Sequence, residues 1–398
     1  MAKRESGPKL YLAIDNCFAS KRWTRPSEWT SIVKDLGVRC IEASADTECD
    51  PLYMAPAYLK QWVGEVDRAC GKAGVEVVNL YSGHGTYTTL GLAGNDPRNR
   101  RHMVERWLKA MIGMASRLDA GLGFFCHAFA DALLQDPDGY AAAERELVRT
   151  LAGLAAHARR RGVKTIVVEQ MYTPHQVPWT LGGAARLLGD VWARGGAPFY
   201  LTIDTGHQSG QRKFLRPDAE QIGQALGRFR SSGKTGALWL GPASAYRIFR
   251  QAAAATRAGE ARCLRRLDAE MDRFPHLFAR PEDGDPYAWL EQLGGYSPII
   301  HLQQTDGRSS SHQPFTEDRN RAGIIHADRV LKAIAKAYAR EPLPGLPPQC
   351  EAIYLTLEVF SPTAALPAAI LEDLAESVAY WRRYIPRDGL RLGGILGL

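Results

Sequence analysis

Short, continuous apolar runs alternate along the chain with longer stretches whose apolar residues recur at helical spacing. Each short run has the length and composition of a buried strand, and each longer stretch predicts an amphipathic helix. The expected strands cover residues 10–14, 38–41, 75–80, 122–126, 165–168, 199–203, 299–302 and 353–357. This alternation is typical of an α/β fold with a parallel sheet covered by helices. Eight units favour closure into a (β/α)8 barrel, the TIM-barrel architecture, over an open sheet.

The alternation is interrupted after the sixth expected strand. Residues 208–297 carry little strand signal, and their spacing predicts helices near 217–229, 243–258, 261–274 and 285–293. We therefore expect one barrel domain over residues 8–398 that contains a long, mostly helical insertion at 208–297. Because the insertion follows the end of a strand, it should lie on the face that carries a barrel's chemistry, as a lid or an oligomer contact.

Four of the expected strands finish at a side chain that can bind a metal. These residues, the strand-end set, are Glu169, Asp204, His301 and Glu358, on the fifth to eighth strands. A single acid at a strand end is more often a helix cap or an ion-pair partner, but four on consecutive strands favour a shared site. In a closed barrel the C-terminal ends of neighbouring strands meet on one face. Three carboxylates and one imidazole suit Mn²⁺, Mg²⁺ or Co²⁺ and tolerate Zn²⁺, so we expect one divalent ion.

Further polar residues follow other strands and should face the same mouth. His84 and His127 end the third and fourth strands, and Glu42 ends the second. Arg308 and His312 lie in a Gly/Ser-rich loop after the seventh strand, where an arginine can hold a phosphate or a sugar hydroxyl. We treat all five as substrate-binding candidates. The alternative is that they cap helices, bond within the pocket wall or belong to a solvated loop.

Composition narrows the class of protein. The 398 residues carry a net charge of +7, and the basic residues are dispersed, which favours a small-molecule enzyme over a nucleic-acid-binding protein. Seven cysteines without a CxxC pair indicate a reducing compartment. No apolar run reaches membrane-spanning length, and residues 1–10 show no apolar signal region. We expect a cytoplasmic enzyme without membrane or nucleic-acid partners.

Four segments resemble one known family, and they are IVVEQ at 166–170, LTIDTGH at 201–207, IIHLQQTDG at 299–307 and LTLEVF at 355–360. The chain resembles the xylose isomerase-like TIM barrels, and within them the sugar and sugar-phosphate isomerases and epimerases, including ketose 3-epimerases and tetrulose-phosphate enzymes. The most specific parts are the Asp204-x-x-His207 spacing and Glu358. The resemblance implies that the strand-end set holds one divalent metal and that His207 contacts the substrate. It also implies that Glu169 and Glu358 transfer protons and that the enzyme forms homo-oligomers.

The residue types support this chemistry. Moving a proton beside a carbonyl needs a Lewis acid on the oxygen and a base at the carbon. Two glutamates suit an epimerase, in which one removes the proton and the other returns it through a metal-stabilised cis-enediolate. A single carboxylate would serve an aldose–ketose isomerase, and the sequence leaves both reactions open. Small ketoses or ketose phosphates are the expected substrates.

Two other functions remain as alternatives. The endonuclease IV-like phosphodiesterases share the barrel and use three zinc ions. Much of their ligand set would be matched by His84, His127, His207 and the strand-end set. These phosphodiesterases also have an Asp-x-His after the seventh strand, whereas here Asp306 is followed by Gly307 and Arg308. The second alternative is a non-catalytic sugar-binding barrel, against which the complete strand-end set argues.

Overall fold

The computed structural model describes residues 7–83, 91–126 and 128–397. Eight parallel strands run in the order β2-β3-β4-β5-β6-β7-β8-β1, and the pairing of β1 with β2 closes the barrel. Their bounds are Lys9–Asp15 (β1), Cys40–Ser44 (β2), Glu76–Ser82 (β3), Gly121–Phe124 (β4), Ile166–Glu169 (β5), Tyr200–Asp204 (β6), Ile299–Leu302 (β7) and Ala352–Leu357 (β8). A short strand, β9 (Leu390–Arg391), pairs antiparallel with β1. The predicted (β/α)8 barrel is therefore confirmed.

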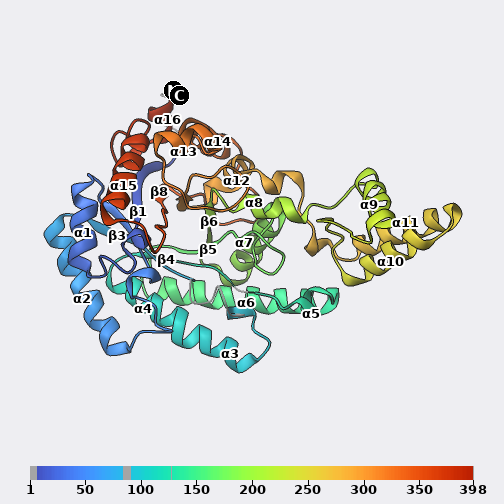
Figure 1. The fold of residues 1–398 in the computed structure, drawn as a ribbon. Helices are drawn as coiled ribbons and strands as arrows, with labels where there is room; N and C mark the ends of the chain where they lie inside the picture. Colours follow the sequence, from blue (N-terminus) through green and yellow to red (C-terminus); the bar gives the residue numbers. More distant parts are fainter. Residues whose placement is uncertain (1–6, 84–90, 127, 398) are drawn as a thin grey trace.

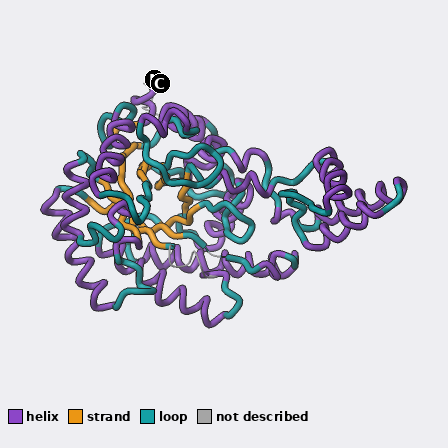
Figure 2. The backbone as a smooth tube through the Cα atoms, in the orientation of Figure 1, coloured by secondary structure: helices purple, strands orange, loops and turns teal. Residues whose placement is uncertain are grey.

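Helices enclose the strands, as Figure 2 shows with the strands in orange and the helices in purple. The principal helices around the barrel are α1 (Pro26–Asp35), α2 (Pro56–Ala73), α3 (Pro97–His102), α4 (Lys109–Arg117), α6 (Pro137–Arg160), α7 (Leu181–Gly195), α12 (Pro286–Leu293), α14 (Ala327–Ala339) and α15 (Pro367–Arg382). Shorter helices are α5 (Asp131–Leu134), α8 (Gln208–Gln211), α13 (Glu317–Ala322) and α16 (Leu392–Leu396). A π-helical segment, Met103–Leu108, joins α3 to α4. No helix among the described residues has the length and apolar character needed to cross a membrane.

Helix α7 shows how the local sequence forms this layer. The Thr180 hydroxyl accepts the backbone N–H of Gly183 and so caps the helix, and Gly196 ends it at a φ of +56°. Leu188 and Val191 on its inner face are fully buried. The strands are mostly apolar on both faces because side chains fill the barrel and helices cover its outside, with polar exceptions such as Glu42 and Asn79.

The insertion after β6 contains α9 (Ala219–Ser232), α10 (Ala243–Ala254) and α11 (Arg257–Asp272). These helices extend from one side of the barrel (Figure 1), and we call residues 215–279 the arm. The arm has its own apolar core, formed by Ile222, Ala225, Leu226, Leu240, Ala245, Phe249, Ala252, Leu267 and Met271. Its two ends lie side by side, because Leu215 and Ala279 form a bridge. The fourth expected helix, 285–293, corresponds to α12, which packs against α7 and α14 in the barrel layer.

Candidate metal centre and active site

The four residues of the strand-end set converge. Each offers one ligand atom, and these atoms all lie within 4.8 Å of one another. Adjacent strands bring them together, since Asp204 pairs with His301 in register and Glu358 directly follows β8. All four side chains are buried, with at most 4% of any residue exposed. One imidazole and three carboxylates in such a space form a donor set for a hard divalent cation.

His301 is held in one orientation by residues on both sides of its ring. Nε2 lies 3.1 Å from Oε2 of Glu42, whose other oxygen accepts the Asn79 amide at 2.9 Å. Nδ1 faces the opposite way, 3.0 Å from Oε1 of Glu169 and 3.4 Å from Oε2 of Glu358. Burial opposes the imidazolium, but the carboxylates of Glu358 and Glu42 raise the pKa of His301 well above its usual value. With Glu42 accepting the Nε2 proton, Nδ1 is the nitrogen available to a metal.

Glu358 supplies a buried carboxylate oxygen that faces two imidazoles. Among the described residues, its Oε2 has no hydrogen-bond partner. The nearest nitrogens are the Nδ1 atoms of His301, at 3.4 Å, and His312, at 3.2 Å. Burial disfavours the carboxylate, but these two imidazoles lower the pKa of Glu358 well below its usual range. A buried anionic oxygen without a hydrogen bond suits coordination to a cation.

The Asp204 carboxylate is held by hydrogen-bond donors from its own turn and from the loop that follows β7. Its Oδ1 accepts the backbone N–H groups of Gly206 and His207 at 2.6 and 3.1 Å. The Gln303 amide nitrogen lies 2.9 Å from both carboxylate oxygens. A Cβ at Gly206 would lie 2.4 Å from the Gln303 side chain, so this contact requires glycine. Burial raises the pKa of Asp204, whereas the neighbouring His207 opposes that rise.

Glu169 is held by a tyrosine that our sequence analysis did not select. The Tyr81 hydroxyl donates to Oε2 of Glu169, and the Tyr81 ring meets His301 edge-on, with centroids 5.1 Å apart. Burial and the charge of Glu169 raise the pKa of Tyr81 well above its usual value, so the phenol stays a neutral donor. The sequence signal that could have identified Tyr81 was its position near the C-terminal end of β3, on the same face of the barrel as the strand-end set.

A cavity of about 300 Å³ opens beside the strand-end set. Glu169 and Glu358 line it together with the aromatic side chains of Phe125, Tyr172 and Phe360. The volume lies at the small end of the range of ligand pockets. The cavity therefore offers a small molecule two carboxylates and an aromatic wall.

The match to a protein family can now be set beside this geometry. The family model of the xylose isomerase-like TIM barrels matches residues 31–231, just over half of the chain. The chain belongs to this family. The resemblance that the strand motifs indicated is thereby confirmed.

Individual relatives of this xylose isomerase-like barrel include sugar epimerases. Over 117 residues the chain is 33% identical to D-erythrulose 1-phosphate 3-epimerase of Brucella abortus (strain 2308), a match that spans 29% of this chain and only 34% of that enzyme. The putative xylose isomerase of Rhodospirillum rubrum ATCC 11170 is 19% identical, with a TM-score of 0.67 over 94% of this chain and 99% of that one. The D-psicose 3-epimerase of Clostridium cellulolyticum H10, solved with D-tagatose, is 12% identical, with a TM-score of 0.52 over 96% and 99% of the two chains. These two structures establish a shared fold.

The sequence-predicted pocket residues divide into two groups in this xylose isomerase-like barrel. His207 and His312 line the cavity. Nδ1 of His207 donates to the Gln170 carbonyl at 2.7 Å, which leaves Nε2 for other partners. His312 has a left-handed φ of +44°, and its backbone N–H donates to Gln303 at 2.6 Å. Burial opposes its protonation, but Glu358 raises the pKa of His312 to about 9.

Two other candidates, Glu42 and Arg308, do not line the cavity. Glu42 is fully buried and bonded to His301 and Asn79, so it does not line the cavity as a hydroxyl-binding group would. The Arg308 side chain is 90% exposed, and its nearest carboxylate is that of Asp306, at 3.8 Å. His84 and His127 lie outside the described residues.

Proposed function

We propose that the chain is a divalent-metal-dependent isomerase or epimerase of a small ketose or ketose phosphate. The convergence of the strand-end set carries the proposal: two glutamates, an aspartate and a histidine offer ligand atoms within 4.8 Å of one another. Two of these residues, Glu169 and Glu358, also line a cavity of small-molecule size. Family membership and the name of the Brucella relative support the same reaction class.

The strand-end set would hold one metal ion. His301 contributes Nδ1, because Glu42 takes the proton on Nε2, and Glu358 contributes an oxygen that has no hydrogen bond among the described residues. A divalent ion in this position supplies Lewis acidity to a substrate carbonyl oxygen. Oxygen-rich ligands favour Mn²⁺, Mg²⁺ or Co²⁺, and Zn²⁺ is the less favoured choice.

Glu169 and Glu358 are the proposed proton-transfer groups. Their strands β5 and β8 are separated by β6 and β7, so the two carboxylates approach the cavity from different parts of the barrel rim. In an epimerase one carboxylate takes the proton from the carbon beside the carbonyl and the other returns it to the opposite face. In an aldose–ketose isomerase one carboxylate carries the proton between adjacent carbons. Tyr81 orients Glu169 in both cases.

His207 is the proposed contact to a substrate hydroxyl. Its Nδ1 proton is committed to the Gln170 carbonyl, so a neutral ring presents Nε2 as an acceptor. Nε2 lies 3.9 Å from Oδ2 of Asp204, and the ring lines the cavity, which places the acceptor next to the strand-end set. A hydroxyl that donates to Nε2 would hold the substrate beside the two glutamates.

Metal content measured together with proton exchange tests the proposal. The purified chain is analysed for metal, stripped with a chelator and incubated in D2O with C4–C6 ketoses and ketose phosphates, followed by NMR. We expect one divalent ion per chain and metal-dependent deuterium exchange beside a carbonyl. Deuterium exchange with inversion at that carbon identifies the enzyme as an epimerase, and formation of an aldose identifies it as an aldose–ketose isomerase.

Matched variants sharpen this test. Glu358→Gln should abolish exchange, whereas Glu144→Gln, which changes a partly buried carboxylate on α6, should leave exchange within about twofold of the wild type. Three zinc ions per chain without exchange on any substrate would refute the proposal and favour a phosphodiesterase. Exchange that persists after complete metal removal would also refute it.

A further inference from the structure

A groove of about 430 Å³ lies on the outer helical layer, between the α3–α4 region and α6. Its basic lining consists of Arg100, Arg101, Lys109, Arg149 and Arg160, which together we call the cationic groove. Among the described residues, Glu146 is the one acidic residue that lines it. The groove shares no lining residue with the cavity beside the strand-end set, so its function is a separate question.

Acidic neighbours leave much of this positive charge uncompensated. Arg149 pairs with Glu146, and Lys109 pairs with Glu105 at 2.6 Å. The other three basic residues, Arg100, Arg101 and Arg160, have no carboxylate within 4.0 Å in the described part of the chain. Arg100 instead donates to the backbone carbonyl of Gly94 at 2.6 Å. The guanidinium groups of Arg101 and Arg160, and the N–H groups of Arg100 other than those of Nη1, are thus available in one groove for an anionic ligand.

A histidine in the groove lies among the same basic side chains. His157 lies on α6 and lines the groove. Burial lowers its pKa, and the charges of Lys109 and Arg160 lower it further. The neighbouring cations therefore disfavour another positive charge at this position, as expected where positive potential is not neutralised.

The groove also has an apolar part and a fixed wall. Val104 and Leu154 line it from the two helical sides. Val104 belongs to the π-helical segment, a distortion that occurs frequently at functional sites. The same segment carries Trp107, whose indole N–H donates to the buried Ser82 hydroxyl of β3 at 2.8 Å. This hydrogen bond attaches the π-helical segment to the barrel and so restricts the backbone beside the basic side chains.

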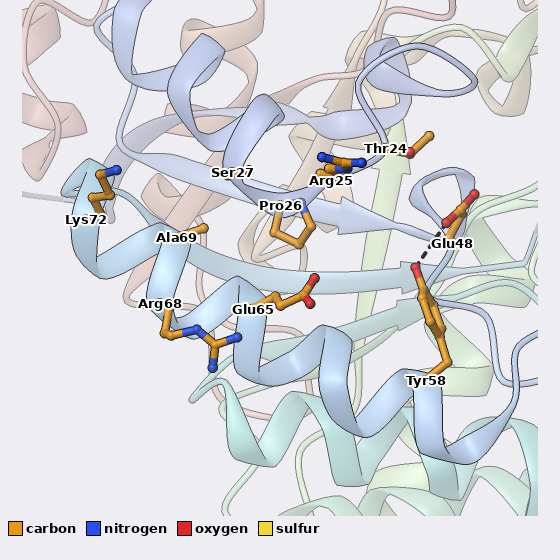
Figure 3. Close-up of a pocket in the computed structure, with 10 residues that line it drawn as sticks. All are labelled: Thr24, Arg25, Pro26, Ser27, Glu48, Tyr58, Glu65, Arg68, Ala69 and Lys72. Atoms are coloured by element: carbon orange, nitrogen blue, oxygen red, sulfur yellow. Dashed lines mark hydrogen bonds between the residues drawn. The ribbon is translucent and has the colours of Figure 1, made fainter.

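A second surface cavity provides a contrast. A cavity of about 640 Å³ lies at α1 and α2. In Figure 3, Glu65 extends from α2 towards α1. Glu65 and Glu48 share the lining of this cavity with Arg25, Arg68 and Lys72. Opposite charges are mixed there, whereas in the cationic groove five basic residues face one acid that is already paired. A single sign of charge is therefore not a general feature of surface cavities in this chain.

We propose that the cationic groove binds a small molecule that carries an oligophosphate chain. Guanidinium groups match phosphoryl oxygens with paired hydrogen bonds, and several adjacent arginines suit several linked phosphoryl groups. The groove's volume falls within the range of small-ligand sites. Val104, which is only partly buried, offers an apolar contact for an organic ring attached to the oligophosphate. This inference does not depend on the proposed isomerase or epimerase reaction.

Calorimetric titration with inorganic tripolyphosphate is the direct test. We expect saturable binding of one ion per chain, with an affinity that falls as ionic strength rises from about 0.02 to 0.15 M. The double variant Arg101→Ala/Arg160→Ala should weaken binding by about tenfold or more. Thr150→Glu, which adds a carboxylate to the groove lining, should have the same effect. Circular dichroism of each variant verifies that the fold is retained.

The matched control is Arg68→Ala/Lys72→Ala, which removes the same charge from the cavity of Figure 3 and should change affinity by less than about twofold. ATP should bind at least as tightly as tripolyphosphate. Equal weakening by both double variants would refute the site, because it would indicate general attraction to a basic protein. Equal affinity for a glutamate hexapeptide would refute the ligand class in favour of an acidic protein segment. Absence of saturation at millimolar tripolyphosphate would refute both the site and the ligand class.

Discussion

Oε2 of Glu42 and Nε2 of His301 lie 3.1 Å apart, on the side of the imidazole away from Glu169 and Glu358. Both residues are fully buried, and Asn79 holds the second oxygen of Glu42. This arrangement selects the histidine nitrogen that faces the other carboxylates. It assigns Glu42 to the support of His301, a proposed metal ligand, and the position of Glu42 at a strand end does not reveal that contact.

Loss of the Glu42 carboxylate should weaken metal binding. We expect Glu42→Ala to reduce metal affinity by roughly 10- to 100-fold, because the ring of His301 loses the partner that fixes its orientation. Glu42→Gln, which retains an acceptor, should have a smaller effect. Titration of the metal-free variants by calorimetry measures both. A direct substrate-binding role would instead raise KM and leave metal affinity unchanged, which would contradict our assignment.

Metal removal should destabilise the chain. The strand-end set brings three buried carboxylates together, and a bound cation offsets their repulsion. A ligand that binds only the folded state contributes about 2.7 kcal/mol at 100 times its Kd, so Tm should rise with metal concentration. Differential scanning calorimetry after chelation and re-addition measures this effect. Asp204→Asn should show a much smaller response, and an identical Tm with and without metal would contradict the site.

Tyr81 should affect turnover more than substrate binding. Tyr81→Phe removes the hydroxyl that donates to Glu169 and leaves most of the ring volume in place. We expect kcat to fall by about tenfold, the effect of a misplaced proton-transfer group, with metal content unchanged. Steady-state kinetics with the substrate identified by deuterium exchange separates kcat from KM. A rise in KM alone would indicate that Tyr81 contacts the substrate instead.

Thiol reactivity should be confined to the arm at neutral pH. Cys263 on α11 is partly exposed, whereas the other six cysteines are buried. Burial raises the pKa of Cys40 to about 12 and that of Cys70 to about 11, so both remain neutral thiols well above pH 8. A chromogenic disulfide reagent should therefore label one thiol rapidly, and Cys263→Ser should remove that phase. Several fast thiols in the native protein would contradict this burial pattern.

The arm should respond to core mutations separately from the barrel. Phe249 is fully buried in the arm's own apolar core, and its replacement by alanine should destabilise the arm by about 3–5 kcal/mol. Hydrogen exchange followed by mass spectrometry should show faster exchange in α9–α11 and unchanged protection of the barrel strands. Leu188→Ala, in the barrel layer, is the matched comparison, with its increase centred on α7. Uniform acceleration in Phe249→Ala would show that arm and barrel unfold together.

Much of the fold was predictable because its signals are local. A buried parallel strand needs a short apolar run, and an outer helix needs an apolar stripe, so both are visible in neighbouring residues. The last helix of the expected insertion was harder to place. α12 has an apolar pattern like that of a barrel helix, and only its packing against α7 and α14 separates it from the arm.

The sequence by itself determined the barrel and the convergence of Glu169, Asp204, His301 and Glu358, because parallel topology places consecutive strand ends on one rim. Tertiary structure alone decided which other polar groups join them. Tyr81 is one of fifteen tyrosines, and the sequence alone does not distinguish it from the others. Glu42 and Arg308 each follow an expected strand, yet the Glu42 carboxylate contacts Nε2 of His301 whereas the Arg308 guanidinium is exposed to solvent. The direction of a side chain depends on partners distant in sequence, so periodicity along the chain cannot encode it.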